Sequence, residues 1–264
     1  MKRRENIHGK RIEINGRDVH YYTAGQGAPL VVIHGGAGDA ATWWNNIAAL
    51  SDKYTVYVPD LPGFGGSEPL DLDSDHYIPE LTEFVDSFAR SLGLDSFYLV
   101  GHSLGGGVAL NYTLKSPRRI KKLVLVSSLC LGREIALWVK LISLPARSIG
   151  SAVMTVFRAI KWLVKKLLIP VEFMVPLSPT SVNLISSITT FREQTLVLAN
   201  RLSEIMIPTL VVWGAKDSIV PVRHAYAAAQ VIPHCQLKVF ENRGHDVHRD
   251  EINEFSRLLA GFLG

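Results

Sequence analysis

The stretch that decides the fold is residues 97–110, which read FYLVGHSLGGGVAL. Residues 97–100 form a short apolar run typical of a buried strand, and residues 104–110 are small and apolar, as in a buried helix. Between them, Gly-x-Ser-x-Gly puts Ser103 on a sharp strand-to-helix turn, where its oxygen would project above the sheet. The glycines are needed there because side chains would collide with neighbouring elements. We therefore predict that Ser103 is a nucleophile and not only a helix cap.

The pattern on both sides of this stretch predicts a three-layer α/β fold with a mostly parallel sheet of eight strands. An Asn15-Gly16 turn predicts an N-terminal antiparallel hairpin. Buried parallel strands are expected at the short apolar runs 30–33, 54–58, 97–100, 123–126, 209–213 and 237–240. Parallel strands need crossovers, and helical periodicity supplies them at 42–50, 77–92, 104–114, 222–231 and 251–262.

One interval is too long for a single crossover helix, since roughly 80 residues separate the runs at 123–126 and 209–213. We predict a core in two parts, residues 1–130 and 205–264, with a helical cap inserted at residues 131–204. Between 151 and 165, polar residues recur every three or four positions, which predicts a helix that Pro170 ends. Basic residues dominate the insertion. They are expected to keep the cap soluble, although weak contact with a membrane surface stays open.

Composition limits the partners of the chain. With 264 residues, 47% of them apolar, it can bury one large core, and a net charge of +4 is too small for a nucleic-acid-binding face. Its two cysteines lie far apart and indicate neither a disulfide framework nor a metal site. The N-terminus lacks the apolar run of a secretory signal, and charges interrupt residues 135–177 before a membrane span is reached. We expect a cytoplasmic monomer or homodimer.

A serine nucleophile needs a base and an acid, which follow in the order Ser, Asp, His on this kind of sheet. Asp217 comes just after the apolar run at 209–213, and His245 comes after the run at 237–240. The carboxyl ends of parallel strands share one edge, so both are expected near Ser103. Asp217 would orient the imidazole of His245, which would move the proton. Two alternatives are open: Asp217 as a turn residue, and His248 as the base.

Acyl transfer also needs donors for the oxyanion. The loop His34-Gly35-Gly36 follows the first parallel strand, and we predict that the backbone amides of Gly36 and Leu104 are these donors. Ala37 is close enough to be confused with Gly36. The same loop would turn into a helix capped by Asp39, which is compatible with the functional interpretation.

These motifs together resemble the α/β-hydrolase-fold enzymes, in the branch with His-Gly after the third strand and a cap between strands six and seven. The resemblance covers nearly the whole chain and rests on five segments: 34–36, 60–67, 101–105, 213–217 and 244–245. It implies an oxyanion hole made by Gly36 and Leu104. Asp60 lies where no catalytic group is expected in the family, and we interpret it as fixing the Pro62-Gly63 turn.

The resemblance also narrows the reaction. Relatives with an aspartate nucleophile, the epoxide hydrolases and haloalkane dehalogenases, are disfavoured by Ser103. Similar carbon-carbon bond hydrolases usually have Asn before the serine and Trp after the histidine, whereas this chain has His102 and Asp246. We therefore expect a carboxylesterase that acts on a small-molecule ester of short or medium acyl chain, with no metal and no cofactor. The alternatives are a carbon-carbon bond hydrolase, an interfacial lipase and a non-catalytic small-ligand receptor.

Overall fold

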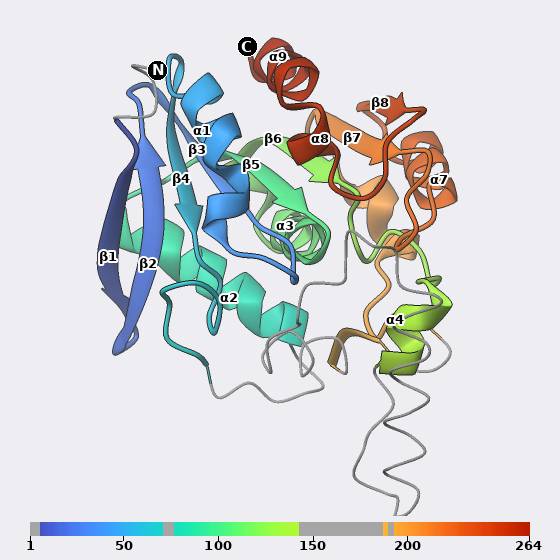
Figure 1. Cartoon of the computed structure of the whole chain (residues 1–264), viewed down its shortest axis with the longest axis horizontal. Helices are drawn as coiled ribbons and strands as arrows, with labels where there is room; N and C mark the ends of the chain where they lie inside the picture. The colour runs from blue at the N-terminus through green and yellow to red at the C-terminus, as the bar shows by residue number, and fades with distance from the viewer. Residues whose placement is uncertain (1–5, 71–76, 143–186, 190–192) are drawn as a thin grey trace, which may run out of the picture.

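An eight-stranded, mostly parallel sheet forms the centre of the molecule (Figure 1). The computed structural model describes residues 6–70, 77–142, 187–189 and 193–264. The strand order is β1-β2-β4-β3-β5-β6-β7-β8, and only the pairs β1–β2 and β2–β4 are antiparallel. This confirms the predicted fold class. The strands are β1 (His8–Ile14), β2 (Arg17–Ala24), β3 (Ala28–Ile33), β4 (Tyr54–Pro59), β5 (Phe97–His102), β6 (Ile120–Val126), β7 (Thr209–Gly214) and β8 (Cys235–Phe240).

The hairpin of β1 and β2 turns at Asn15 and Gly16, as predicted. Both residues have positive φ, 52° and 77°, which is the geometry of a two-residue type I′ turn. The turn sets the register, in which Ile14 pairs with Arg17 and His8 with Thr23.

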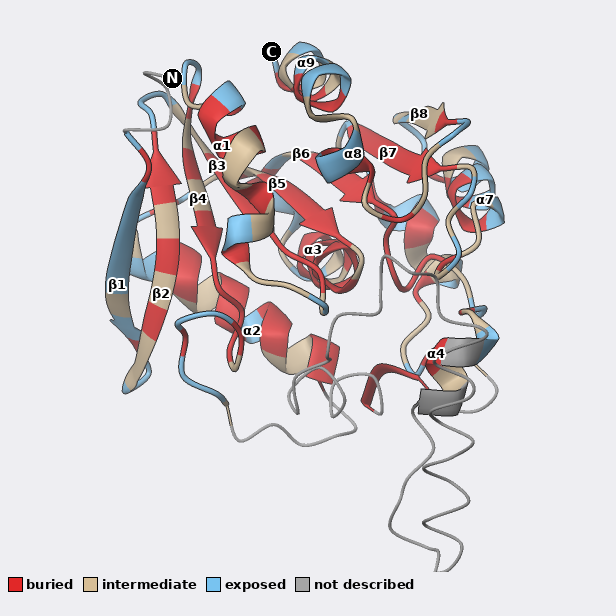
Figure 2. Cartoon of the chain, in the orientation of Figure 1, coloured by how far each residue is buried: buried red, intermediate tan, exposed pale blue. Residues whose placement is uncertain are grey.

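Helices cover both faces of the sheet, because successive strand residues point to opposite sides. Val31 and Ile33 of β3 pack toward α2, α3 and α7, whereas Leu30 and Val32 pack toward α1 and α9. Figure 2 shows the resulting buried centre, with exposed residues on the outer helix faces, in the loops and along β1. The helices are α1 (Trp44–Leu50), α2 (Tyr77–Ser91), α3 (Leu104–Lys115), α4 (Leu137–Ile142), α7 (Arg223–Val231), α8 (Val247–Asp250) and α9 (Ile252–Leu263).

The two ends of the predicted insertion are fastened to each other by one side chain. Gln194 Oε1 accepts the Cys130 amide at 2.8 Å, and Gln194 Nε2 donates to the carbonyls of Gly132 and Glu134 at 2.9 and 3.1 Å. The Leu198 amide donates to Cys130 O at 2.8 Å. The chain therefore leaves the sheet after β6 and returns toward β7 through neighbouring points.

Most of the predicted cap, including the helix at 151–165 and Pro170, lies outside the described residues. No helix in the described ranges is long and apolar enough to span a bilayer. Both cysteines are free, but only Cys130 is a core thiol. Cys235 is half-buried, because β8 forms an edge of the sheet.

Two helical glycines are expected to respond oppositely to the same substitution. A Cβ on Gly105 in α3 would lie 2.4 Å from Ile33 O, because the helix packs directly on the end of β3. We expect Gly105→Ala to lower the free energy of unfolding by about 1–3 kcal/mol or more through overpacking. Gly261 in α9 has nothing within 4 Å of its Cβ position, so Gly261→Ala should raise stability by about 0.5–1 kcal/mol. Urea unfolding of both variants tests this, and a stabilised Gly105→Ala protein would contradict it.

Candidate functional site

Ser103 lies on the predicted sharp turn between β5 and α3. Its backbone has φ 53° and ψ −113°, a conformation that non-glycine residues rarely adopt. Neighbouring elements hold it there: Ser103 N donates to Val126 O at 2.9 Å, and Ser103 O accepts the Leu129 amide at 3.0 Å. A Cβ on Gly101 would lie 2.2 Å from Gly105 O, so the strand and helix meet without room for a side chain. The structure thus holds the serine in a strained conformation at the carboxyl end of β5.

Asp217 and His245 meet at the same edge of the sheet. His245 Nδ1 donates to Asp217 Oδ2 at 2.8 Å, and the two side chains are 4% and 0% exposed respectively. The other carboxylate oxygen, Oδ1, accepts the amides of Ile219 and Val220 at 2.9 and 3.0 Å. Asp217 is therefore both a turn residue and the partner of His245, so the two interpretations of the sequence coexist.

The surroundings of Asp217 favour its charged form. Burial opposes ionisation, but the His245 charge, the His245 hydrogen bond and the two backbone amides outweigh it and hold the pKa of Asp217 below its ordinary value. A neutral imidazole that donates from Nδ1 carries its basic lone pair on Nε2. The pair can therefore present a base whose tautomer is fixed by a carboxylate.

His102 connects the serine turn to the loop that carries His245. His102 Nε2 donates to His245 O at 3.1 Å, and the two ring centroids are 4.9 Å apart. A Cβ on Gly35 would lie 2.8 Å from His102 Nδ1 and 3.3 Å from Ser103 Cβ. Loops after β3, β5 and β8 therefore converge around one imidazole. Burial, followed by the His245 charge, lowers the pKa of His102 to about 4, so the ring is neutral near pH 7.

The two predicted oxyanion donors lie beside this convergence. Gly36 follows β3 and is half-buried, and Leu104 is the first residue of α3, where backbone amides lack an intrahelical acceptor. Ala37 is exposed, which favours Gly36 as the donor of the loop. Asp39 accepts the Ala41 amide at 2.9 Å, as expected of a cap.

His34 fixes the loop of Gly36 through hydrogen bonds of both its ring nitrogens. Its Nδ1 donates to Gly35 O at 2.8 Å, and its Nε2 accepts the Leu61 amide at 2.9 Å. The neutral ring thus uses both nitrogens, and a protonated ring would lose the bond to Leu61. Burial lowers the pKa of His34 below its ordinary value of 6.5.

Asp60 closes the loop that contains the predicted Pro62-Gly63 turn, although its carboxylate bonds to neither of these two residues. Its carboxylate accepts the amides of Ala40 at 2.7 Å and Gly66 at 2.8 Å, and it also pairs with His20 at 2.8 Å. Gly63 N donates to Glu68 O instead. The reason is steric, since Gly65 has φ 51° and brings the backbone directly against the carboxylate of Asp60. Asp60 therefore ties the 60–66 loop to the segment after β3.

The neutral His34 predicts a pH-dependent stability. As the pH falls below about 6.5, the unfolded chain binds a proton at this histidine before the folded protein does. Through this residue, each pH unit below 6.5 therefore lowers the free energy of unfolding by up to about 1.4 kcal/mol. The full stabilising contribution of the neutral ring is present only above pH 6.5. His34→Gln should remove that part of the slope, measured by urea unfolding between pH 6.5 and 5. Parallel slopes for His34→Gln and the parent protein would contradict this account.

His248 is not the partner of Asp217. It is 1% exposed and stacks on Trp43 with ring centroids 4.3 Å apart. Its nitrogens lie with His102 and Asp246 in a cluster whose ligand atoms are within 4.8 Å of one another. This cluster was missed in the sequence, where the Asp-x-His spacing at 246–248 was the only signal.

Comparison with known proteins identifies the family of the chain. A family model described as the α/β hydrolase fold matches residues 28–169 and 175–251. The 2-hydroxy-6-oxo-6-phenylhexa-2,4-dienoate hydrolase of Burkholderia cepacia is 31% identical over 260 residues, which cover 93% of this chain and 91% of that protein.

Two solved structures show similar folds. A membrane phospholipase A, described as a bacterial virulence factor, superposes with a TM-score of 0.78 at 22% identity, over 98% of this chain and 86% of that one. A carboxylesterase from Bacillus subtilis superposes with a TM-score of 0.74 at 20% identity, over 97% of this chain and 91% of that one.

Proposed function

The chain belongs to the α/β-hydrolase fold family, and from that premise we propose that it hydrolyses carboxylic esters of short or medium acyl chain. The observation that carries the proposal is the buried, hydrogen-bonded pair of Asp217 and His245, whose loop is bonded through His102 to the turn that holds Ser103 at positive φ. A strained serine and a carboxylate-oriented histidine on one sheet edge suit acyl transfer. The proposed reaction needs no metal or cofactor.

In the proposed mechanism, Ser103 Oγ attacks the ester carbonyl while His245 Nε2 takes its proton. The amides of Gly36 and Leu104 donate to the oxyanion of the tetrahedral intermediate. When the intermediate collapses, His245 returns the proton to the leaving alcohol and the acyl group stays on Ser103. Water then attacks the acyl-serine with His245 again as the base, which releases the acid. Asp217 stabilises the His245 cation in both halves.

Carbon-carbon bond hydrolysis is the second candidate, because a relative of 31% identity is a hydrolase of 2-hydroxy-6-oxo-6-phenylhexa-2,4-dienoate. His102 favours the ester. Its ring fills the space between Gly35 and His245 O, where the carbon-carbon bond hydrolases that the chain resembles usually have the smaller Asn.

The test measures kcat/KM for a series of p-nitrophenyl esters of increasing acyl length and for that dienoate. Ester hydrolysis that is fastest at short or medium chains, with little turnover of the dienoate, supports the proposal. The reverse preference would replace it with carbon-carbon bond hydrolysis. Rates that rise on long-chain emulsions would indicate an interfacial lipase. A protein that turns over neither substrate and does not react with a fluorophosphonate probe, yet binds a small ligand tightly, would be a receptor.

A further inference from the structure

His248 is a buried imidazole with unsatisfied hydrogen-bonding capacity. Neither of its ring nitrogens has a hydrogen-bond partner among the described residues, although the side chain is almost completely buried. Trp43 stacks on one face of the ring and Phe255 approaches its edge. Buried polar atoms are nearly always paired, and an unpaired one points to an unseen water or ion.

The groups nearest to His248 are metal-ligand types. The rings of His102 and His248 have centroids 4.4 Å apart, and His102 Nε2 lies 3.5 Å from Asp246 Oδ1. Two imidazoles and a carboxylate are ligands that Zn²⁺ prefers, and a tetrahedral ion with bonds of about 2.0 Å holds its ligand atoms about 3.3 Å apart. The distance from His102 to Asp246 is close to this value, and all three ligand atoms already lie within 4.8 Å of one another.

We propose that His102, Asp246 and His248 bind a divalent transition-metal ion, best matched by Zn²⁺, and that this ion inhibits the enzyme. Asp246 opens the site to solvent, since its side chain is 28% exposed while those of the two histidines are buried. A water can complete the coordination from that side. Arg249, which lies 3.4 Å from Asp246 Oδ2, is 55% exposed and can turn into solvent when the ion enters.

Inhibition follows from the hydrogen bond that His102 makes in the absence of the ion. Its Nε2 proton is donated to His245 O. A metal ion needs the Nε2 lone pair, so the proton must move to Nδ1 and the bond to His245 is lost. Binding of the ion is independent of the proposed function, whereas its effect on the rate rests on it.

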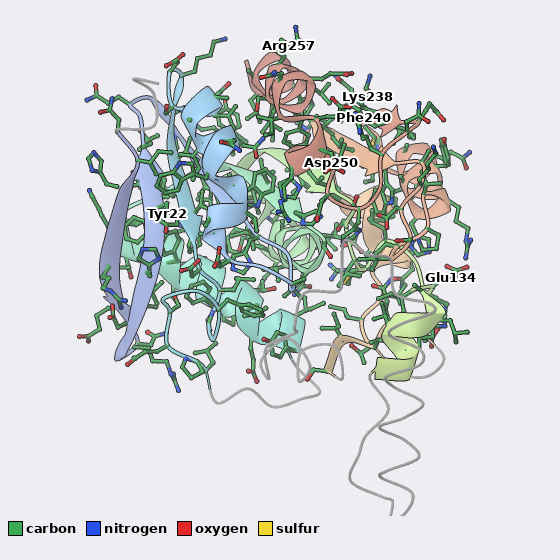
Figure 3. The ribbon with its side chains drawn as sticks, viewed as in Figure 1. Tyr22, Glu134, Lys238, Phe240, Asp250 and Arg257 are labelled. Atoms are coloured by element: carbon green, nitrogen blue, oxygen red, sulfur yellow. The ribbon has the colours of Figure 1, made fainter. Side chains whose placement is uncertain are left out.

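The test titrates the purified protein with ZnCl₂ by calorimetry and measures ester hydrolysis in parallel. We expect one ion per chain, and affinity at least about tenfold lower in Asp246→Asn. His248→Phe keeps an aromatic ring stacked on Trp43 but removes the ligand nitrogens. Its Zn²⁺ affinity should fall as much as that of Asp246→Asn. Asp250→Asn is the matched control, because Asp250 lies exposed on the same short helix, outside the cluster (Figure 3). It should bind like the parent protein.

The rate measurement separates the two parts of the proposal. Zn²⁺ should lower kcat several-fold in the parent protein and in Asp250→Asn, with recovery on adding a chelator, and should have no such effect in Asp246→Asn. Equal Zn²⁺ affinity in Asp246→Asn and the parent protein would overturn the site, as would no binding at submillimolar Zn²⁺. Binding without a change in kcat would overturn the inhibitory role. A protein without esterase activity would leave the calorimetric result to decide the site on its own.

Discussion

Replacing Ser103 with alanine is expected to lower kcat for ester hydrolysis by about 10⁴- to 10⁶-fold, because no other group can form the acyl intermediate. The residual rate over water would come from the oxyanion donors and substrate binding. Stability should change little, since the Ser103 backbone bonds to Val126 and Leu129 do not involve the side chain. The measurement compares burst and steady-state release of p-nitrophenol in the two proteins.

The control for this variant is Ser127→Ala. Ser127 also has positive φ, 45°, and follows the adjacent strand β6. Its Oγ is buried and has no hydrogen-bond partner within the described part of the chain. The same substitution at this second positive-φ serine should therefore leave kcat nearly unchanged. If Ser103→Ala kept most of its activity, the acyl-serine mechanism would be wrong.

The second large effect is expected at Asp217. In Asp217→Asn the side-chain oxygen can still accept the amides of Ile219 and Val220, which places the NH₂ group against His245 Nδ1. An NH₂ group there requires a lone pair on Nδ1, so the proton moves to Nε2 and the base is lost. We expect kcat to fall by about 10⁴-fold.

Asp217→Ala separates orientation of the histidine from support of the turn. It should be as inactive as Asp217→Asn, but it should also lose stability, because two backbone amides lose their acceptor at a cost of about 1–3 kcal/mol each. Ester kinetics and urea unfolding of both variants provide the comparison. Nearly full activity in either variant would show that His245 does not need the carboxylate.

The sequence predicted most of the sheet and the turn at Ser103, because both depend on local patterns. Continuous apolar runs indicate the buried strands. The glycines on either side of Ser103 indicate a close approach of strand and helix, and a Cβ added to Gly101 would lie 2.2 Å from Gly105 O. Asp217 and His245 were expected near each other because parallel strands end at one edge, and they share a hydrogen bond.

The remaining features depend on how loops meet, which periodicity does not encode. The sequence places Asp60 at the Pro62-Gly63 turn but does not predict its bonds, which go to Gly66 at the end of that loop and to Ala40 after β3. His102 and His245 are 143 positions apart in the chain, and nothing in their spacing predicts that one donates to the carbonyl of the other. His248 is the alternative base in the sequence. In the structure its ring stacks on Trp43, and His245 is the histidine that bonds to Asp217.

Gln194 bears on how the chain between β6 and β7 can be varied. Because one amide side chain bonds to Cys130, Gly132 and Glu134, the exit of the chain from β6 and its return toward β7 are held together outside the sheet. The pairing of β6 with β7 is complete without any residue between these two points, so substitutions between them are expected to leave the register of the strands unchanged. Ser103, Asp217 and His245 also lie outside that stretch of the sequence, so libraries that vary it should leave the proposed hydrolytic centre intact.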